Sequence, residues 1–186
     1  FVATDFLERY CLKTPIRKLD YSQIRELAKD TLVPAALVAL ARFRRSQDIR
    51  FLEDRIRQSI FVLRILPNGN SPNYSSYGLA AIREFPDSNF YPILEKSVDD
   101  FIAGKSISRR MLFQAIMQYQ TDSAVRLLQK AVDYSDRENH YRTQTDLAIA
   151  LIKYPDLLFR DKFSGQIKLD FKSIVTWHHF EEESDL

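Results

Sequence analysis

The sequence predicts an all-α protein, an α-α superhelix of about four helical hairpins. A five-residue pattern (Ala, then Leu or Ile, any two residues, then Phe or Tyr) begins at Ala39, Ala81, Ala115 and Ala150. The copies lie about 34–42 residues apart, and self-similarity at such a period is typical of stacked helical repeats. The chain has only 4 Gly among 186 residues, which disfavours the many tight turns of an all-β fold.

Each copy predicts the first helix of a hairpin. The Ala and the aromatic residue four positions later share one helix face, and the Leu or Ile between them widens the apolar stripe. We expect the small Ala to allow close helix approach, and the aromatic residues Phe43, Phe85 and Tyr119 to fill the core. On this interpretation, Phe85→Ala lowers the free energy of unfolding by about 3–5 kcal/mol.

A second helix is predicted after a short polar break in each copy. Apolar residues recur at the same two distances after the aromatic residue, without a gap, in three copies: Leu52 and Ile56, Leu94 and Val98, and Leu128 and Val132. The fourth copy keeps Phe163 and Ile167 but has Lys162 at a position that is apolar in the others. Terminal units of an array are commonly atypical because they face water. Asp and Ser residues in the breaks are predicted to cap these helices.

The segment Met111–Val132 resembles a HEAT repeat. It combines a first helix containing small residues, a polar turn with Asp122, and a second helix of the form Ala-Val-x-x-Leu. Residues 35–57 and 77–99 resemble the repeat less closely, and 146–167 only in part. The chain departs from the family in placing an aromatic residue before the turn. The resemblance implies an armadillo-type α-solenoid that acts as a scaffold or adaptor, and it specifies no activity.

The predicted organisation is one structural domain in three parts. Residues 1–33 form N-terminal capping helices, 34–167 the HEAT-like repeat array, and 168–186 a C-terminal cap with an acidic tail. In the first part, Asp20 and Gln23 predict a capping box for a helix that begins at Tyr21. Residues 166–180 fit both a strand and a helix, and we favour a closing helix because a lone strand has no partner.

The sequence lacks the short motifs that mark common catalytic and phosphate-binding sites. The sequence has no Gly-rich phosphate loop, no Gly-x-Ser-x-Gly elbow and no His-Glu-x-x-His. The single Cys11 is interpreted as a buried thiol, and the adjacent His178 and His179 diverge around a helix, which makes them a poor ligand pair. We therefore predict no cofactor, no metal and no enzymatic activity. An enzyme of unrecognised type is kept as an alternative. No apolar run approaches the roughly 20 residues that span a bilayer.

Charge patterning favours a protein or peptide partner. The net charge is +2, and the Arg-rich region from Arg42 to Arg64 supports nucleic-acid binding as the alternative function. However, exposed positions predicted on the second helices mix both signs, which suits a protein surface better. The candidate partner-binding residues are Arg50, Asp54, Arg57, Lys96, Arg126 and Lys130.

The expected function is thus a non-enzymatic interaction scaffold or adaptor that presents a mixed-charge concave surface. The chain begins with Phe1 rather than Met, so we expect it to be an excised part of a larger chain or a processed mature chain. The partner, the oligomeric state and the compartment stay open, with the cytoplasm slightly favoured.

Overall fold

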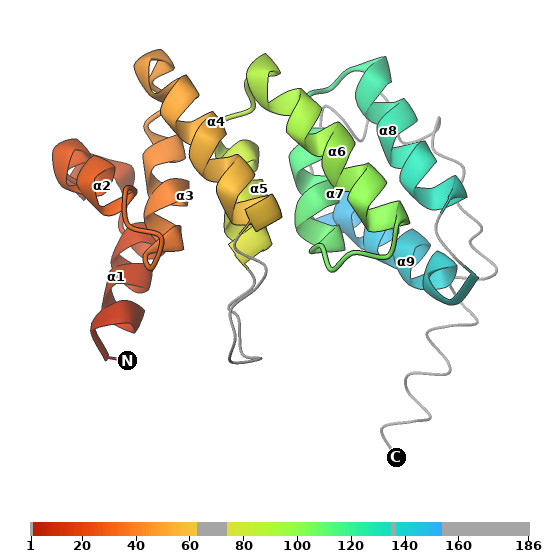
Figure 1. Cartoon of the computed structure of the whole chain (residues 1–186), viewed down its shortest axis with the longest axis horizontal. Coiled ribbons are helices and arrows are strands. Elements are labelled where there is room, and N and C mark those ends of the chain that lie inside the picture. The colour runs from red at the N-terminus through yellow and green to blue at the C-terminus, as the bar shows by residue number, and fades with distance from the viewer. Residues whose placement is uncertain (1, 63–73, 135–136, 154–186) are drawn as a thin grey trace. The chain divides into compact units, whose positions relative to one another are not determined.

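The computed structural model describes residues 2–62, 74–134 and 137–153. Within these ranges every regular element is a helix and no strand occurs (Figure 1). The all-α prediction is therefore confirmed for this part of the chain. The chain divides into two compact units, residues 1–94 and 95–186, and the division falls inside helix α6 (Tyr91–Ile102).

The first unit is organised around one central helix. Its α-helices are α1 (Val2–Lys13), α2 (Tyr21–Leu27), α3 (Pro34–Arg42), α4 (Ile49–Arg57) and α5 (Tyr74–Glu84). Shorter turns are the 3₁₀ segments η1 (Ile16–Lys18), η2 (Ser46–Asp48) and η4 (Ser88–Phe90), and the π-helical η3 (Gln58–Val62) that extends α4. Helix α3 contacts α1, α2, α4 and α5. Its residues 35–41 are all buried, as expected for a helix that is apolar on every side.

The described residues of the second unit form the remainder of α6 and three further helices, α7 (Arg109–Met117), α8 (Asp122–Asp133) and α9 (Arg137–Lys153). Helix α7 packs against both α8 and α9, and α8 also contacts α9. The predicted first helices thus correspond to α3, α5, α7 and α9, and the predicted second helices to α4, α6 and α8.

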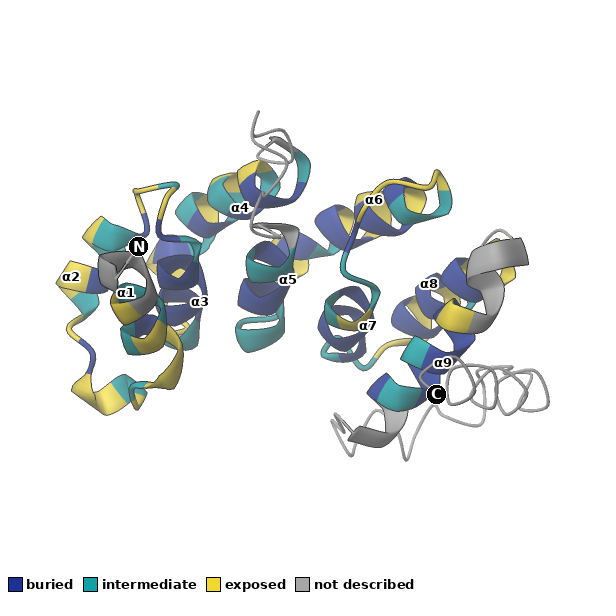
Figure 2. Ribbon diagram, turned by 90° about the horizontal axis from the view of Figure 1, so that it is seen from below, coloured by how far each residue is buried: buried dark blue, intermediate teal, exposed yellow. Residues whose placement is uncertain are grey.

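The small-residue positions of the pattern are buried as predicted. Ala39, Ala81, Ala115 and Ala150 have no exposed surface, and neither do the aliphatic residues that follow the first three. On the second helices, the apolar register is equally buried at Leu52, Ile56, Leu94, Val98, Leu128 and Val132. Figure 2 shows the same division: most of α3 and α7 is buried, whereas α4, α6 and α8 expose residues along one side.

The aromatic positions of the pattern require a correction. Phe43, Phe85 and Tyr119 are only half-buried, because each lies at or just beyond the C-terminus of its helix and not within it. Phe43 is the C-cap of α3, and Phe85 follows the last residue of α5. Among the described residues, the aromatic side chains without exposed surface are Phe90 and Phe113, which the pattern does not include.

Helix termini agree in part with the predicted caps. The Asp20 carboxylate accepts hydrogen bonds from the Ser22 hydroxyl at 2.6 Å and from the Gln23 amide at 2.9 Å. These bonds hold the pKa of Asp20 below its ordinary value, since they stabilise the charged form. Helix α8 is capped by Thr121, which accepts from the Ala124 amide. The polar break is thus correctly located, although Asp122 is not the capping residue.

Several predictions fall on residues outside the described ranges. They concern the aromatic position of the fourth copy (Tyr154), the second helix of that copy, the region 166–180, His178 and His179, and the acidic end. The predicted boundaries at residues 33 and 167 stay predictions.

Gly78 lets α5 pack directly against η3. A Cβ at this position would lie 2.3 Å from Ser59 Oγ and 2.8 Å from Ile60 Cγ1, and Ser59 and Ile60 are both buried. We expect Gly78→Ala to lower the free energy of unfolding by about 1–3 kcal/mol through overpacking. In an exposed helix the same change would add about 1 kcal/mol of stability. The packing contact therefore determines whether Gly78→Ala raises or lowers the free energy of unfolding.

Urea denaturation of the Gly78→Ala variant measures this effect. Adding Ser59→Ala removes the nearest clashing atom and should restore part of the lost stability. A Gly78→Ala variant at least as stable as the parent chain would show that α5 and η3 are not in close contact.

Candidate interaction surfaces

The predicted partner-binding residues lie on the outer sides of the second helices. Arg50 and Asp54 on α4 are exposed, and Arg57 on the same helix is half-buried. In the second unit Lys96 on α6 and Arg126 and Lys130 on α8 are exposed. The apolar stripes of these helices face the core, so the charges lie on the remaining helix surface.

In the second unit, Lys96 and Lys130 form ion pairs with acidic side chains of the same unit. Lys130 Nζ lies 2.6 Å from Asp99 Oδ1 and links α8 to α6. The hydrogen bond to Asp99 raises the pKa of Lys130. Lys96 Nζ lies 3.6 Å from Asp100 Oδ1, and Lys105 Nζ lies 2.7 Å from the same oxygen. These ion pairs neutralise both lysines of this face within the unit itself, so neither lysine requires a partner protein to balance its charge.

The α4 face differs because two of its charges have no partner among the described residues. Arg57 donates to Glu53 at 2.9 Å, one helical turn away. Among the residues that the structure describes, Arg50 and Asp54 form no hydrogen bond and no ion pair through their side chains. They lie four positions apart on an exposed helix face. Of the predicted site residues, these two are the ones most available to a partner in the first unit.

The Arg-rich region is largely occupied by contacts within the first unit. Arg42 donates to the Cys11 carbonyl at 3.1 Å, Arg44 to the Glu84 carbonyl at 2.9 Å, and Arg55 to the Ala28 carbonyl at 3.1 Å. Desolvation lowers the pKa of Arg55. These arginines serve as links between helices, which leaves fewer of them for a phosphate backbone than their number in the sequence indicates.

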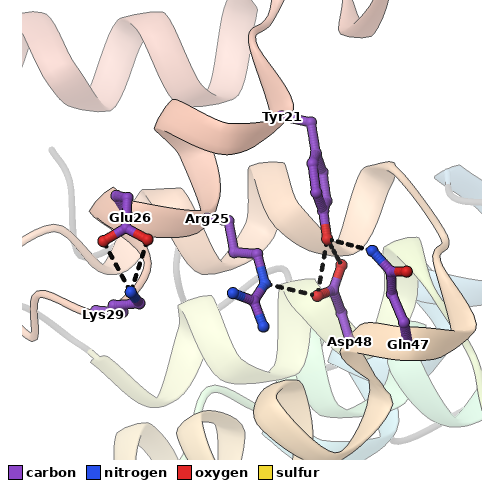
Figure 3. Close-up of polar contacts among 6 residues, drawn as sticks. All are labelled: Tyr21, Arg25, Glu26, Lys29, Gln47 and Asp48. Atoms are coloured by element: carbon purple, nitrogen blue, oxygen red, sulfur yellow. Dashed lines mark hydrogen bonds and ion pairs between the residues drawn. The ribbon is translucent and has the colours of Figure 1, made fainter.

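A buried carboxylate joins α2 to the turn between α3 and α4. The Tyr21 hydroxyl lies 2.8 and 3.0 Å from the two oxygens of Asp48, and Arg25 Nε donates to Asp48 at 3.0 Å. Gln47 Nε2 donates to the Tyr21 hydroxyl at 2.9 Å. Figure 3 shows Tyr21 and Arg25 of α2 both pointing toward the Asp48 carboxylate. Asp48 has no exposed surface, so this network satisfies a charge that would otherwise be costly to bury.

Aromatic contacts extend the Asp48 network. The guanidinium carbon of Arg45 lies 3.6 Å from the centre of the Tyr21 ring, and the Tyr21 and Phe43 rings meet edge to face at 5.3 Å. Arg25 lies over Phe51 of α4 at 5.7 Å. The sequence interpretation missed this arrangement, because it took Asp48 as a capping residue and as one of the acids interleaved in the Arg-rich region. Its side chain makes no cap hydrogen bond to α4.

In the described part of the chain, the cysteine and the possible metal ligands give no sign of a reactive thiol or a metal centre. Cys11 is buried as predicted, and desolvation raises the pKa of its thiol to about 11, so the reactive thiolate is scarce at neutral pH. No cluster of His, Cys, Asp or Glu suited to a metal ion occurs among the described residues. None of the described helices has the length and apolar character that crossing a bilayer requires.

Comparison of the chain with protein-family models, with curated proteins and with solved structures gave no significant match.

Proposed function

We propose that this chain is a HEAT-like array of helical hairpins that binds a protein or peptide partner through its second helices. In this proposal consecutive hairpins stack into a superhelix and carry no catalytic site. Support comes from the regular alternation of first and second helices and from the burial of the same repeat positions in successive copies. A repeat of this kind buries one side of each hairpin and leaves the other side free for recognition.

The exposed pair Arg50 and Asp54 carries the proposal. Opposite charges side by side on one helix suit a partner that presents both signs. Nothing in the described part of the chain neutralises either group. The nucleic-acid alternative is less well supported, because neighbouring acids and internal hydrogen bonds occupy much of the Arg-rich region. A duplex requires rows of cations of one sign.

A charge exchange on α4 tests this function. The chain is used to capture partners from an extract of its source cells, and the affinity of the purified partner is then measured by titration calorimetry. We expect the double variant Arg50→Glu with Asp54→Lys to bind about tenfold more weakly, a loss of about 1.4 kcal/mol. The exchange leaves the net charge unchanged, so a general electrostatic effect is excluded.

The matched control is the same kind of exchange at the C-terminal end of α2. Glu26 and Lys29 are both exposed and form an ion pair at 2.6 Å, which Glu26→Lys with Lys29→Glu preserves in reversed order. The control should bind the partner as the parent chain does. Equal affinity of the α4 variant and the parent chain would contradict the proposal. Binding of duplex DNA that persists at physiological salt would favour the nucleic-acid alternative instead.

A further inference from the structure

Arg45 presents an exposed guanidinium that is held in place without using its hydrogen-bond donors. The group lies over the Tyr21 ring at 3.6 Å, and Arg45 is exposed. Among the described residues it forms no ion pair and donates no side-chain hydrogen bond. A guanidinium carries five N–H donors in a planar fork. Stacking on a ring therefore orients this fork and leaves its donors for a ligand.

The Tyr21 ring is itself fixed from several sides. Its hydroxyl is bound to the buried Asp48 carboxylate and accepts from Gln47 (Figure 3). Its ring meets Phe43 edge to face with an interplanar angle of 78°. Asp48 is held in turn by Arg25. A charged group supported by a fixed ring loses less conformational freedom on binding than one on a free side chain.

Two further cations, Arg17 and Lys18, lie close to Tyr21 in the sequence, and the exposed Asp20 stands between them and Tyr21. The hydrogen bond from Arg42 to the Cys11 carbonyl brings the C-terminal ends of α1 and α3 together. Beyond the end of α1, Arg17 and Lys18 are exposed and have no side-chain partner among the described residues. Lys18 precedes Tyr21 by three residues, so its backbone lies within about 11 Å of that residue. The helix dipole favours cations in the last turn of an α-helix. Arg17, Lys18 and Arg45 lie outside the α-helices, so the dipole does not account for their positions.

We propose that Arg45 is a carboxylate-binding anchor for an acidic segment of a partner protein, with Tyr21 as its positioning residue. The planar fork matches a carboxylate through two parallel hydrogen bonds, and Arg17 and Lys18 supply further positive charge. Exposed Leu12 and Pro15 lie in the same stretch of chain and suit the apolar side chains of a peptide. Single-stranded nucleic acid is disfavoured, because Tyr21 and Phe43 contact each other and Arg45 and are not free to stack bases.

This anchor involves other residues than the α4 charges, so each proposal can fail without the other. The test uses the full chain and a fluorescein-labelled peptide of repeating Glu-Glu-Leu units, with binding followed by fluorescence anisotropy. We expect Arg45→Ala to weaken binding about tenfold or more. Arg45→Lys keeps the charge but lacks the planar fork that binds a carboxylate in a bidentate manner, so its affinity should lie closer to that of the Ala variant. Tyr21→Phe keeps the ring but loses the bonds to Asp48, and a smaller loss is expected.

Lys29→Ala is the matched control, since it removes one exposed positive charge from the turn after α2 and should leave the affinity unchanged. Thermal unfolding of each variant separates loss of the anchor from loss of the fold. Peptide binding that Arg45→Ala leaves unchanged would overturn the proposal. Heparin or duplex DNA that binds more tightly than the peptide at physiological salt, through Arg45, would overturn the assignment of an acidic peptide.

Discussion

Replacing Phe90 with Ala is expected to lower the free energy of unfolding by about 3–5 kcal/mol, the typical cost of removing a buried aromatic side chain. Phe90 has no exposed surface and ends η4, which packs against α4. Its ring also meets Phe85 edge to face at 6.2 Å. The Phe90 backbone is held by its own amide, which donates to the Asp87 carbonyl at 2.9 Å. The site therefore cannot easily collapse around the cavity.

The informative comparison is Phe85→Ala, for which the repeat pattern predicts a loss of the same size. Because Phe85 is half-buried, less apolar surface is lost and water can reach the vacated space, so we expect a loss of about 1–2 kcal/mol. Urea denaturation of both variants decides between the two expectations. A larger loss for Phe85→Ala than for Phe90→Ala would restore the original interpretation of the pattern.

The contrast between Phe85 and Phe90 shows which buried residues sequence periodicity can predict and which it cannot. Ala81 and Ile82 recur at fixed spacing on helices that must bury one side, so their burial could be predicted without any knowledge of neighbours. The aromatic residue that completes the pattern lies where the helix ends, and only part of it is covered there. Phe90 lies in the following turn, where burial depends on the position of α4, and no local pattern encodes that position.

The candidate sites follow the same rule. The exposure of Arg50 and Asp54 follows from the helical register of α4, which the sequence predicts correctly. The Asp48 network joins residues 23 and 27 positions apart in the sequence, so it arises only when α2 docks beside the turn after α3. The role proposed for Arg45 could not be predicted from the sequence either, because there it is one of several arginines. The Tyr21 ring below its guanidinium is what distinguishes it.

Asp48→Ala is expected to lower the free energy of unfolding by about 2–3 kcal/mol, the second largest effect. The change removes the shared acceptor of Tyr21 and Arg25, and hydrogen bonds to a charged acceptor contribute about 1.5–3 kcal/mol each. The sum is reduced because the Arg25 side chain is 41% exposed and its charge can be hydrated once the carboxylate is gone. Asp48→Asn keeps one acceptor oxygen and should be less damaging than Asp48→Ala.

A double-mutant cycle with Tyr21→Phe isolates the bond between the two side chains. If the hydroxyl is bound to Asp48, the two changes together should cost less than the sum of the single changes, with a coupling of about 0.5–3 kcal/mol. Arg45→Ala is the reference for a change outside the carboxylate network, since losing an exposed cation–π contact costs about 1 kcal/mol or less. Additive effects of Tyr21→Phe and Asp48→Ala would show that α2 is not fastened to the turn through this carboxylate. Arg45 would then lack the fixed ring on which its proposed role depends.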